Sequence, residues 1–142
     1  MADQRFVGAW ELQGTEIRDR EGKVIGQSLP GWTGQIMYSA DGHMSAQLMG
    51  PERPVFASAD RLQAPPEQRQ QAFDTYVAYF GTYSVDDGAG VVTHHVRGAS
   101  SPPMVGTDQP RHFELTGHQL VLSPPPRQEG ERTYLTWKRV AP

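Results

Sequence analysis

Short stretches in which hydrophobic and polar residues alternate cover most of the chain, and glycine- or proline-containing turns separate them. This pattern predicts short β-strands at regular spacing, as in a β-barrel or a β-sandwich. We expect eight or nine strands, at residues 6–17, 23–27, 33–39, 43–49, 82–85, 91–97, 111–115, 119–123 and 132–140. The sequence shows no repeat and no domain boundary, so residues 1–142 are predicted to form one domain.

The clearest local prediction is a hairpin around residues 40–42. Ala40-Asp41-Gly42 separates two alternating strands, and Gly42 supplies the left-handed residue that such a turn requires. If Tyr38 pairs with Met44, the residues that share one face of the hairpin are Ile36, Tyr38, Met44, Ala46 and Leu48.

One helix is expected at about residues 66–80. Pro65 and Pro66 stand at its start, where the missing N–H of proline costs no hydrogen bond, and Gly81 ends it. Four apolar residues recur at helical spacing and form a single stripe, namely Phe73, Tyr76, Val77 and Phe80. We predict that the helix packs on the barrel through this stripe, as a lid or a side brace.

Composition narrows the function classes. The chain has no cysteine, which excludes disulfides, thiolate metal sites and cysteine nucleophiles. Its formal net charge of −3 argues against a nucleic-acid or anionic-membrane surface. No apolar run approaches the roughly 18 residues of a membrane span, and the first residues lack the apolar stretch of a signal peptide. With asparagine absent and Lys23 and Lys138 the only lysines, the composition is typical of GC-rich genomes and favours a cytoplasmic bacterial protein.

The sequence predicts no metal and no cofactor. It contains no H-E-x-x-H, G-x-S-x-G or G-K-[ST] motif. His94 and His95 point to opposite faces of one strand and cannot share a metal, and His112 with Glu114 makes only a pair of ligands. Gly88-Ala89-Gly90 precedes a strand, so it indicates a turn and not a nucleotide-binding loop.

Several motifs, in order along the chain, resemble those of a known family. Gly8-Ala9-Trp10 has the G-x-W spacing of the lipocalin superfamily, in which the tryptophan closes the barrel floor beneath an arginine of the last strand; Arg139 would take that role. Further segments are similar to the bacterial and fungal lipocalin-like domain family, namely residues 38–49, 53–58, 93–96, 105–109 and 111–115. The resemblance covers about residues 5–140 and implies an all-β fold, a closed antiparallel up-and-down barrel, without implying one activity.

In a small barrel, side chains alternate between the interior and the exterior along each strand. We therefore predict that His94 faces inward and His95 outward, whereas a register slip of one residue would exchange them. Trp32 and Phe56 lie on loops that could cover the opening. The predicted ligand-binding residues are Trp32, Ile36, Tyr38, Met44, Leu48, Phe56, Tyr83, His94, Met104, Arg111 and Phe113.

Mostly apolar walls with a few polar groups are typical of a small-molecule site. The first hypothesis is therefore binding of a small apolar or amphiphilic molecule inside the barrel. The second is a cofactor-independent enzyme, such as an isomerase, cyclase, dehydratase or lyase, acting on a hydrophobic metabolite. In it His94 would be the acid/base, Tyr38 or Tyr83 would donate to a carbonyl, and Arg111 would stabilise negative charge. The third is a structural or interaction domain with a filled barrel.

Each candidate residue also has a structural alternative. His94 could be a buried histidine whose hydrogen bonds are satisfied internally, and Arg111 could pair with an acid at the barrel rim. Tyr38 and Tyr83 could be core residues with bonded hydroxyls. The sequence predicts no oligomeric state.

Overall fold

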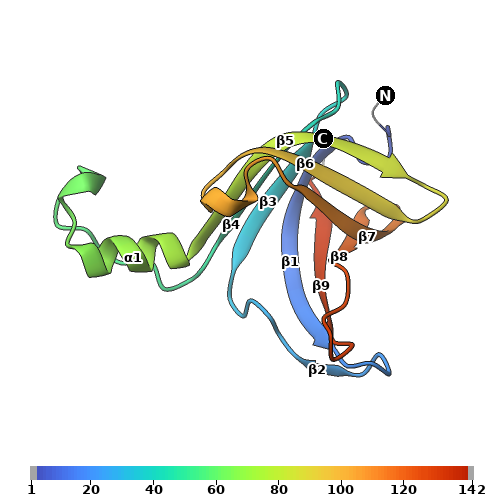
Figure 1. Cartoon of the computed structure of the whole chain (residues 1–142), viewed down its shortest axis with the longest axis horizontal. Coiled ribbons are helices and arrows are strands. Elements are labelled where there is room, and N and C mark those ends of the chain that lie inside the picture. Colours follow the sequence, from blue (N-terminus) through green and yellow to red (C-terminus); the bar gives the residue numbers. More distant parts are fainter. Residues whose placement is uncertain (1–2, 141–142) are drawn as a thin grey trace.

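The strands predicted from the alternating pattern form one antiparallel sheet that closes on itself (Figure 1). A computed structural model describes residues 3–140. The strands are β1 (Gly8–Arg18), β2 (Val24–Gly26), β3 (Thr33–Tyr38), β4 (His43–Met49), β5 (Tyr76–Asp86), β6 (Val91–Ala99), β7 (Asp108–Thr116), β8 (Gln119–Ser123) and β9 (Arg132–Arg139). The helical segments are α1 (Pro66–Asp74) and two 3₁₀ turns, η1 (Arg61–Gln63) and η2 (Pro102–Met104).

Neighbours in the sheet follow the order β2-β1-β3-β4-β5-β6-β7-β8-β9, and an additional pairing of β1 with β9 closes the barrel. The short strand β2 pairs only with β1, so it lies at the side of an eight-stranded barrel. The predicted all-β, closed up-and-down barrel is confirmed. Between residues 3 and 140, no helix has the length and hydrophobicity needed to cross a membrane.

The hairpin of β3 and β4 has the predicted register. Tyr38 pairs with Met44, and Gly42 has a φ of 89°, the left-handed conformation that its turn requires. The shared face points into the barrel, since Ile36, Tyr38, Met44 and Ala46 are all buried.

The predicted helix exists, but it ends at Asp74, and residues 76–80 begin β5 instead. This stretch, Tyr76-Val77-Ala78-Tyr79-Phe80, is rich in the aromatic and β-branched residues that favour strands. It pairs with residues 45–49 of β4, whose backbone hydrogen bonds would otherwise lack a partner. Sheet pairing therefore outweighs the helical spacing of the four apolar residues.

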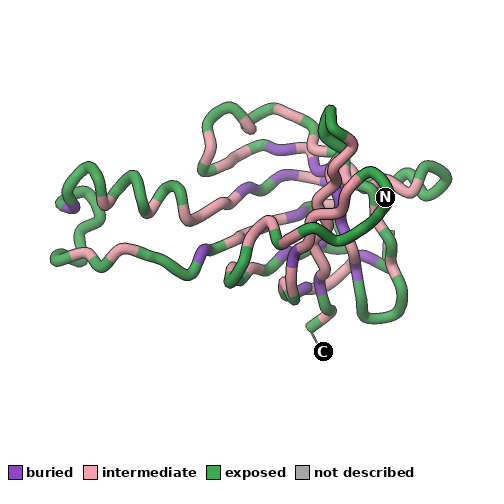
Figure 2. Tube along the Cα trace, turned by 90° about the horizontal axis from the view of Figure 1, so that it is seen from below, coloured by how far each residue is buried: buried purple, intermediate pink, exposed green. Residues whose placement is uncertain are grey.

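The prediction of a lid or side brace is also wrong. Residues 51–75 project away from the barrel as an arm that carries α1 (Figures 1 and 2). No residue of α1 is buried, and Phe73, from the expected stripe, is 52% exposed.

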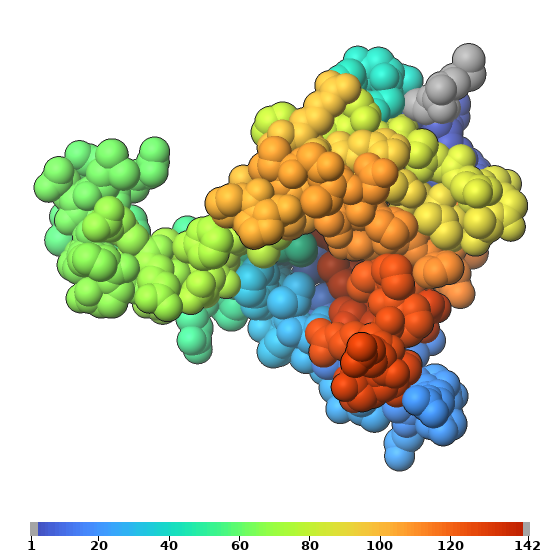
Figure 3. All heavy atoms as spheres, viewed as in Figure 1, coloured from blue at the N-terminus to red at the C-terminus, as the bar shows by residue number. Residues whose placement is uncertain are grey.

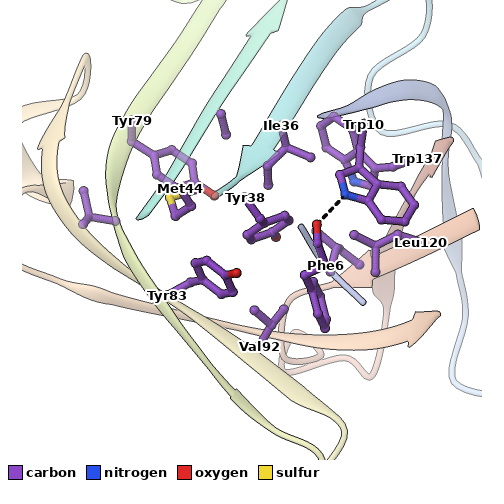
Figure 4. Packing of buried hydrophobic residues seen from close by; sticks show 13 residues of the cluster. Phe6, Trp10, Ile36, Tyr38, Met44, Tyr79, Tyr83, Val92, Leu120 and Trp137 are labelled. Atoms are coloured by element: carbon purple, nitrogen blue, oxygen red, sulfur yellow. Dashed lines mark hydrogen bonds between the residues drawn. The ribbon is translucent and has the colours of Figure 1, made fainter. Parts of the chain in front are cut away.

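One end of the barrel is closed by the segment that precedes β1. Phe6 and Trp10 are fully buried, and the Trp10 indole donates a hydrogen bond to the Phe6 carbonyl at 3.0 Å (Figure 4). The Arg139 guanidinium lies 4.2 Å from the Trp10 ring centroid and donates to the carbonyls of Val7 and Arg5. The floor predicted from the G-x-W spacing is confirmed, and we call these five residues, 5–7, 10 and 139, the floor.

Gly8 fits the floor for a steric reason. Its φ is 132°, and a Cβ atom there would lie 3.0 Å from Nη1 of Arg139. A side chain at this position would therefore press against the cation that covers the indole.

Candidate functional site

Beyond the floor, the barrel interior contains a cavity of about 310 Å³. This volume is near the lower end of the roughly 300–1,000 Å³ of small-molecule sites. In Figure 3 a hollow opens between the segments coloured light blue, orange and red, which are β3, the η2–β7 region and β9. The cavity is lined by Ile36, Ala46, Leu48, Val77, Tyr79, His94, Met104, Gln109, Arg111, Leu122, Pro124, Leu135 and Trp137.

His94 on β6 lies between two tyrosines. Its Nε2 atom is 2.7 Å from the hydroxyl of Tyr38 on β3, and its Nδ1 atom is 2.8 Å from the hydroxyl of Tyr79 on β5. The imidazole is 1% exposed, and both of its nitrogens have a partner. The structural alternative for this residue, a histidine satisfied by internal hydrogen bonds, therefore describes its immediate contacts.

Tyr38, His94 and Tyr79 form a tyrosine–histidine–tyrosine chain of hydrogen bonds, and all three side chains are held neutral. Burial, together with the smaller effects of the positive charges of Arg111 and His95, lowers the pKa of His94 to about 3. Burial also raises the pKa of Tyr38 well above its ordinary value and raises that of Tyr79, because the phenolate would lose its hydration. At neutral pH this chain of hydrogen bonds therefore consists of one neutral imidazole and two neutral phenols.

Arg111 on β7 also borders the cavity. One of its guanidinium nitrogens donates to the Pro110 carbonyl at 2.9 Å. Among residues 3–140 no carboxylate forms an ion pair with it, so the alternative of an acidic partner at the rim is wrong. The cavity wall thus carries a cation that no anion of the described residues neutralises.

Two further cavity residues carry polar atoms. The Gln109 amide nitrogen donates to the Thr107 hydroxyl at 2.9 Å. The Trp137 indole nitrogen is buried and has no hydrogen-bond partner among the described residues. A buried donor without an acceptor costs free energy.

Comparison with known proteins places this barrel in a family. The family model described as a lipocalin-like domain matches residues 7–140. The chain belongs to the lipocalin-like domain family. It is 34% identical, over 107 residues, to the 4'-hydroxy-3'-methoxypropiophenone carrier protein ppsC of Aspergillus oryzae (strain ATCC 42149 / RIB 40). The match covers 68% of this chain and 96% of the carrier protein.

Two solved structures are similar to this lipocalin-like barrel at low sequence identity. A lipocalin-like protein from Bacteroides uniformis ATCC 8492 has a TM-score of 0.47 and 13% identity, with 96% of this chain and 99% of that one covered. A mutant of the fluorescent protein UnaG has a TM-score of 0.45 and 12% identity, with 98% and 99% covered.

The lipocalin-like barrel brings several of the predicted site residues together. Those that line the cavity are Ile36, Leu48, His94, Met104 and Arg111. The predicted orientations on β6 are confirmed, because His95 faces outward and its ring contacts Asp108 at 2.8 Å and Ser84 at 2.9 Å.

Other predicted residues lie elsewhere in the interior. Tyr38 reaches the cavity only through His94, and the Tyr83 hydroxyl donates to the Ser39 carbonyl at 3.1 Å. Phe113 packs edge-on against Phe6, with 5.0 Å between ring centroids, and Met44 belongs to the same core. The prediction that these four residues line the pocket is corrected: the floor segment fills the space that they would have bordered.

The predicted loop residues also lie outside the cavity wall. Trp32 packs against Gly50, where an added Cβ would lie 3.0 Å from the indole. Phe56 belongs to the projecting arm. The prediction that Trp32 and Phe56 cover the opening is therefore corrected, since Trp32 lies against Gly50 and the arm leads Phe56 away from the barrel.

Sequence reasoning missed Tyr79, which the expected helix had absorbed. The signal was present, because Tyr79, Gly81 and Tyr83 alternate with exposed residues and continue the inward face of the next predicted strand. Gln109 and Trp137 were also missed as cavity residues. Gln109 was expected in the loop before the strand at residues 111–115, whereas it belongs to β7. Trp137 was expected in the last strand, but only Arg139 of that strand was given a role.

Proposed function

We propose that this barrel binds a small, largely apolar molecule that carries a hydrogen-bond acceptor oxygen, such as an aromatic ketone or a phenol. The observation that carries the proposal is the composition of the cavity wall. Apolar side chains provide most of it, while Arg111 offers a cation that has no carboxylate partner within residues 3–140. The apolar part would hold a ring or a short hydrocarbon by area burial, and the guanidinium would orient the oxygen.

The name of the fungal relative supports this class of ligand. That protein is named as a carrier of 4'-hydroxy-3'-methoxypropiophenone, whose name describes an aromatic ring with a ketone, a hydroxyl and a methoxy group. The match spans nearly the whole relative, and a barrel of this family with a cavity of about 310 Å³ suits a molecule with one ring.

The surroundings of His94 favour binding over acid/base catalysis. A histidine with a pKa of about 3 does not take up a proton near neutral pH. Both of its nitrogens are occupied by Tyr38 and Tyr79, so neither is free to reach a substrate proton. The enzymatic hypothesis, with His94 as the acid or base, thus has less support than a binding function. The cytoplasmic bacterial origin stays a prediction.

The proposal is tested by calorimetric titration with 4'-hydroxy-3'-methoxypropiophenone as the probe. We expect saturable binding to the wild-type chain, and about tenfold weaker binding to Arg111→Gln, because a hydrogen bond from a charged donor is lost. The matched control is Arg97→Gln, since Arg97 lies on β6 with its side chain exposed on the outside. This control is expected to change the dissociation constant by less than about twofold.

Two results would count against the proposal. One is the absence of saturable binding by this ketone, by benzoate and by 2-naphthol at concentrations up to about 1 mM, the limit of weak specific affinity. The other is equal binding by Arg111→Gln and the wild-type chain, which would remove the guanidinium from the site.

A further inference from the structure

The tyrosine–histidine–tyrosine chain has two ends that differ in their surroundings. Tyr38, at one end, is 2% exposed and does not border the cavity. Tyr79, at the other end, is part of the cavity wall. His94 joins them through distances of 2.7 Å to Tyr38 and 2.8 Å to Tyr79. The chain therefore runs from the packed core to the cavity.

A count of protons restricts how this chain can be arranged. A neutral imidazole has one N–H donor and one lone-pair acceptor. One tyrosine must therefore donate to His94, and the other must accept from it. The accepting tyrosine retains its own O–H proton, which then needs a different acceptor.

The two possible arrangements are not equivalent. His94 is the only hydrogen-bond partner of the Tyr38 hydroxyl among the described residues. If Tyr38 accepted from Nε2, its own proton would be buried without an acceptor, which costs free energy. If Tyr38 donates to Nε2, the imidazole proton is on Nδ1 and is donated to Tyr79. The unused proton is then the one on the Tyr79 hydroxyl, beside the cavity, where a ligand can accept it.

We propose that Tyr38 and His94 fix the direction of this chain, with the proton of His94 on Nδ1, so that Tyr79 acts as a hydrogen-bond donor that selects ligands with an acceptor oxygen. In this role Tyr79 determines specificity, and His94 and Tyr38 are positioning residues. The inference rests on the proposed function and deepens it. It names the atom that reads the ligand's oxygen and assigns His94 a role other than acid or base.

The rest of the cavity wall is consistent with a ligand that accepts. The guanidinium of Arg111, which also lines the cavity, can only donate hydrogen bonds. A ligand whose polar group can only donate, such as an ammonium, would meet a cation and unpaired donors. A ketone or an ester oxygen would satisfy them.

The direction of the hydrogen-bond chain is tested by nitrogen NMR of the protein labelled with ¹⁵N-histidine, without ligand, at pH 7. The His94 signals are identified by their absence in His94→Gln. We expect Nδ1 to carry the proton and Nε2 to have the chemical shift of an unprotonated, hydrogen-bonded nitrogen. A proton on Nε2 in the wild-type chain would overturn the proposal.

Selection by Tyr79 is tested with two probes of the same carbon skeleton, propiophenone and propylbenzene, which differ by one carbonyl oxygen. We expect Tyr79→Phe to weaken the binding of propiophenone about 3- to 10-fold and to change that of propylbenzene less than about twofold. The matched control is Tyr83→Phe, which removes a core hydroxyl bound to the Ser39 carbonyl and should affect both probes equally.

The outcomes separate the two proposals. If both probes bind and Tyr79→Phe affects them equally, selection by Tyr79 is wrong and the binding function stands. If neither probe binds to the wild-type chain, selection by Tyr79 is wrong, and the binding function fails as well if the three probes of the first titration also do not bind. The NMR result decides the direction of the chain in either case, because it uses the wild-type protein without ligand.

Discussion

The hydrogen-bond donors at the two ends of this barrel differ in whether they have partners within the protein. At the floor, the Trp10 indole and two nitrogens of the Arg139 guanidinium donate to backbone carbonyls. At the cavity, the Arg111 guanidinium has no carboxylate partner, and the Trp137 indole has no partner among the described residues. The donors at the floor are used within the protein, whereas the Arg111 cation at the cavity remains free for the ligand that we propose.

The largest effect is expected when the tryptophan of the floor is removed. Trp10 is fully buried, so Trp10→Ala should lower the free energy of unfolding by about 3–5 kcal/mol, through lost burial and the remaining void. Denaturant unfolding measures this loss. If the floor only stabilises, the folded variant should still bind 4'-hydroxy-3'-methoxypropiophenone with a dissociation constant within about twofold of the wild type.

The control is a large side chain of the cavity wall. Met104 is only half-buried, so Met104→Ala should cost about 1 kcal/mol of stability and should weaken binding by removing contact with the ligand. A Trp10→Ala variant that folds normally but no longer binds would contradict the division between the two ends.

The second prediction concerns His94, which lies between the floor and the cavity. Its pKa is lowered to about 3 in the folded chain, from 6.5, because burial penalises the imidazolium. Below pH 6.5 the unfolded chain takes up a proton that the folded chain refuses, so stability falls as the pH is lowered from about 6.5 towards 3. Between pH 6.5 and pH 5 this amounts to about 2 kcal/mol, measured by denaturant unfolding across that range.

The matched variant is His94→Gln, which has no imidazole to titrate and should lose this slope. The pKa values of Asp3 and Asp41 are lowered by hydrogen bonds from Arg5 and Ser39, so these carboxylates titrate below this pH range in both proteins. An equal slope in the variant and the wild-type chain would show that His94 is not the buried neutral group inferred from its surroundings.

Both ends could be predicted in part from the sequence, and for different reasons. The floor was predictable because the G-x-W spacing of Gly8 and Trp10 resembles that of the lipocalin superfamily, which implies an arginine of the last strand over the tryptophan. The inward position of His94 was predictable because Val92 and Val96 set the apolar face of its strand. Local alternation determines which face a residue occupies, and the prediction for His94 needed nothing more.

What could not be predicted depends on contacts between distant segments. Tyr79 was expected in a helix because its pairing partner, Ala46 on β4, lies far from it along the chain and outside the local apolar pattern. Met44 and Phe113 have the right alternation for a pocket. However, Phe6, which precedes β1, fills the space beside them. Alternation does not reveal how far the floor extends into the barrel.

The smallest expected effect belongs to the arm, which takes part in neither end. Phe56 lies on the arm and does not line the cavity, so Phe56→Ala should change the dissociation constant for the ketone less than about twofold. The free energy of unfolding of Phe56→Ala should differ from that of the wild type by less than about 1 kcal/mol, because the Phe56 side chain packs against no part of the buried core. Leu48→Ala, in the cavity wall, is the positive control that should weaken the same titration. A tenfold loss of affinity in Phe56→Ala would instead mean that the arm folds over the opening when ligand binds, and the comparison would then need a third, mobile part.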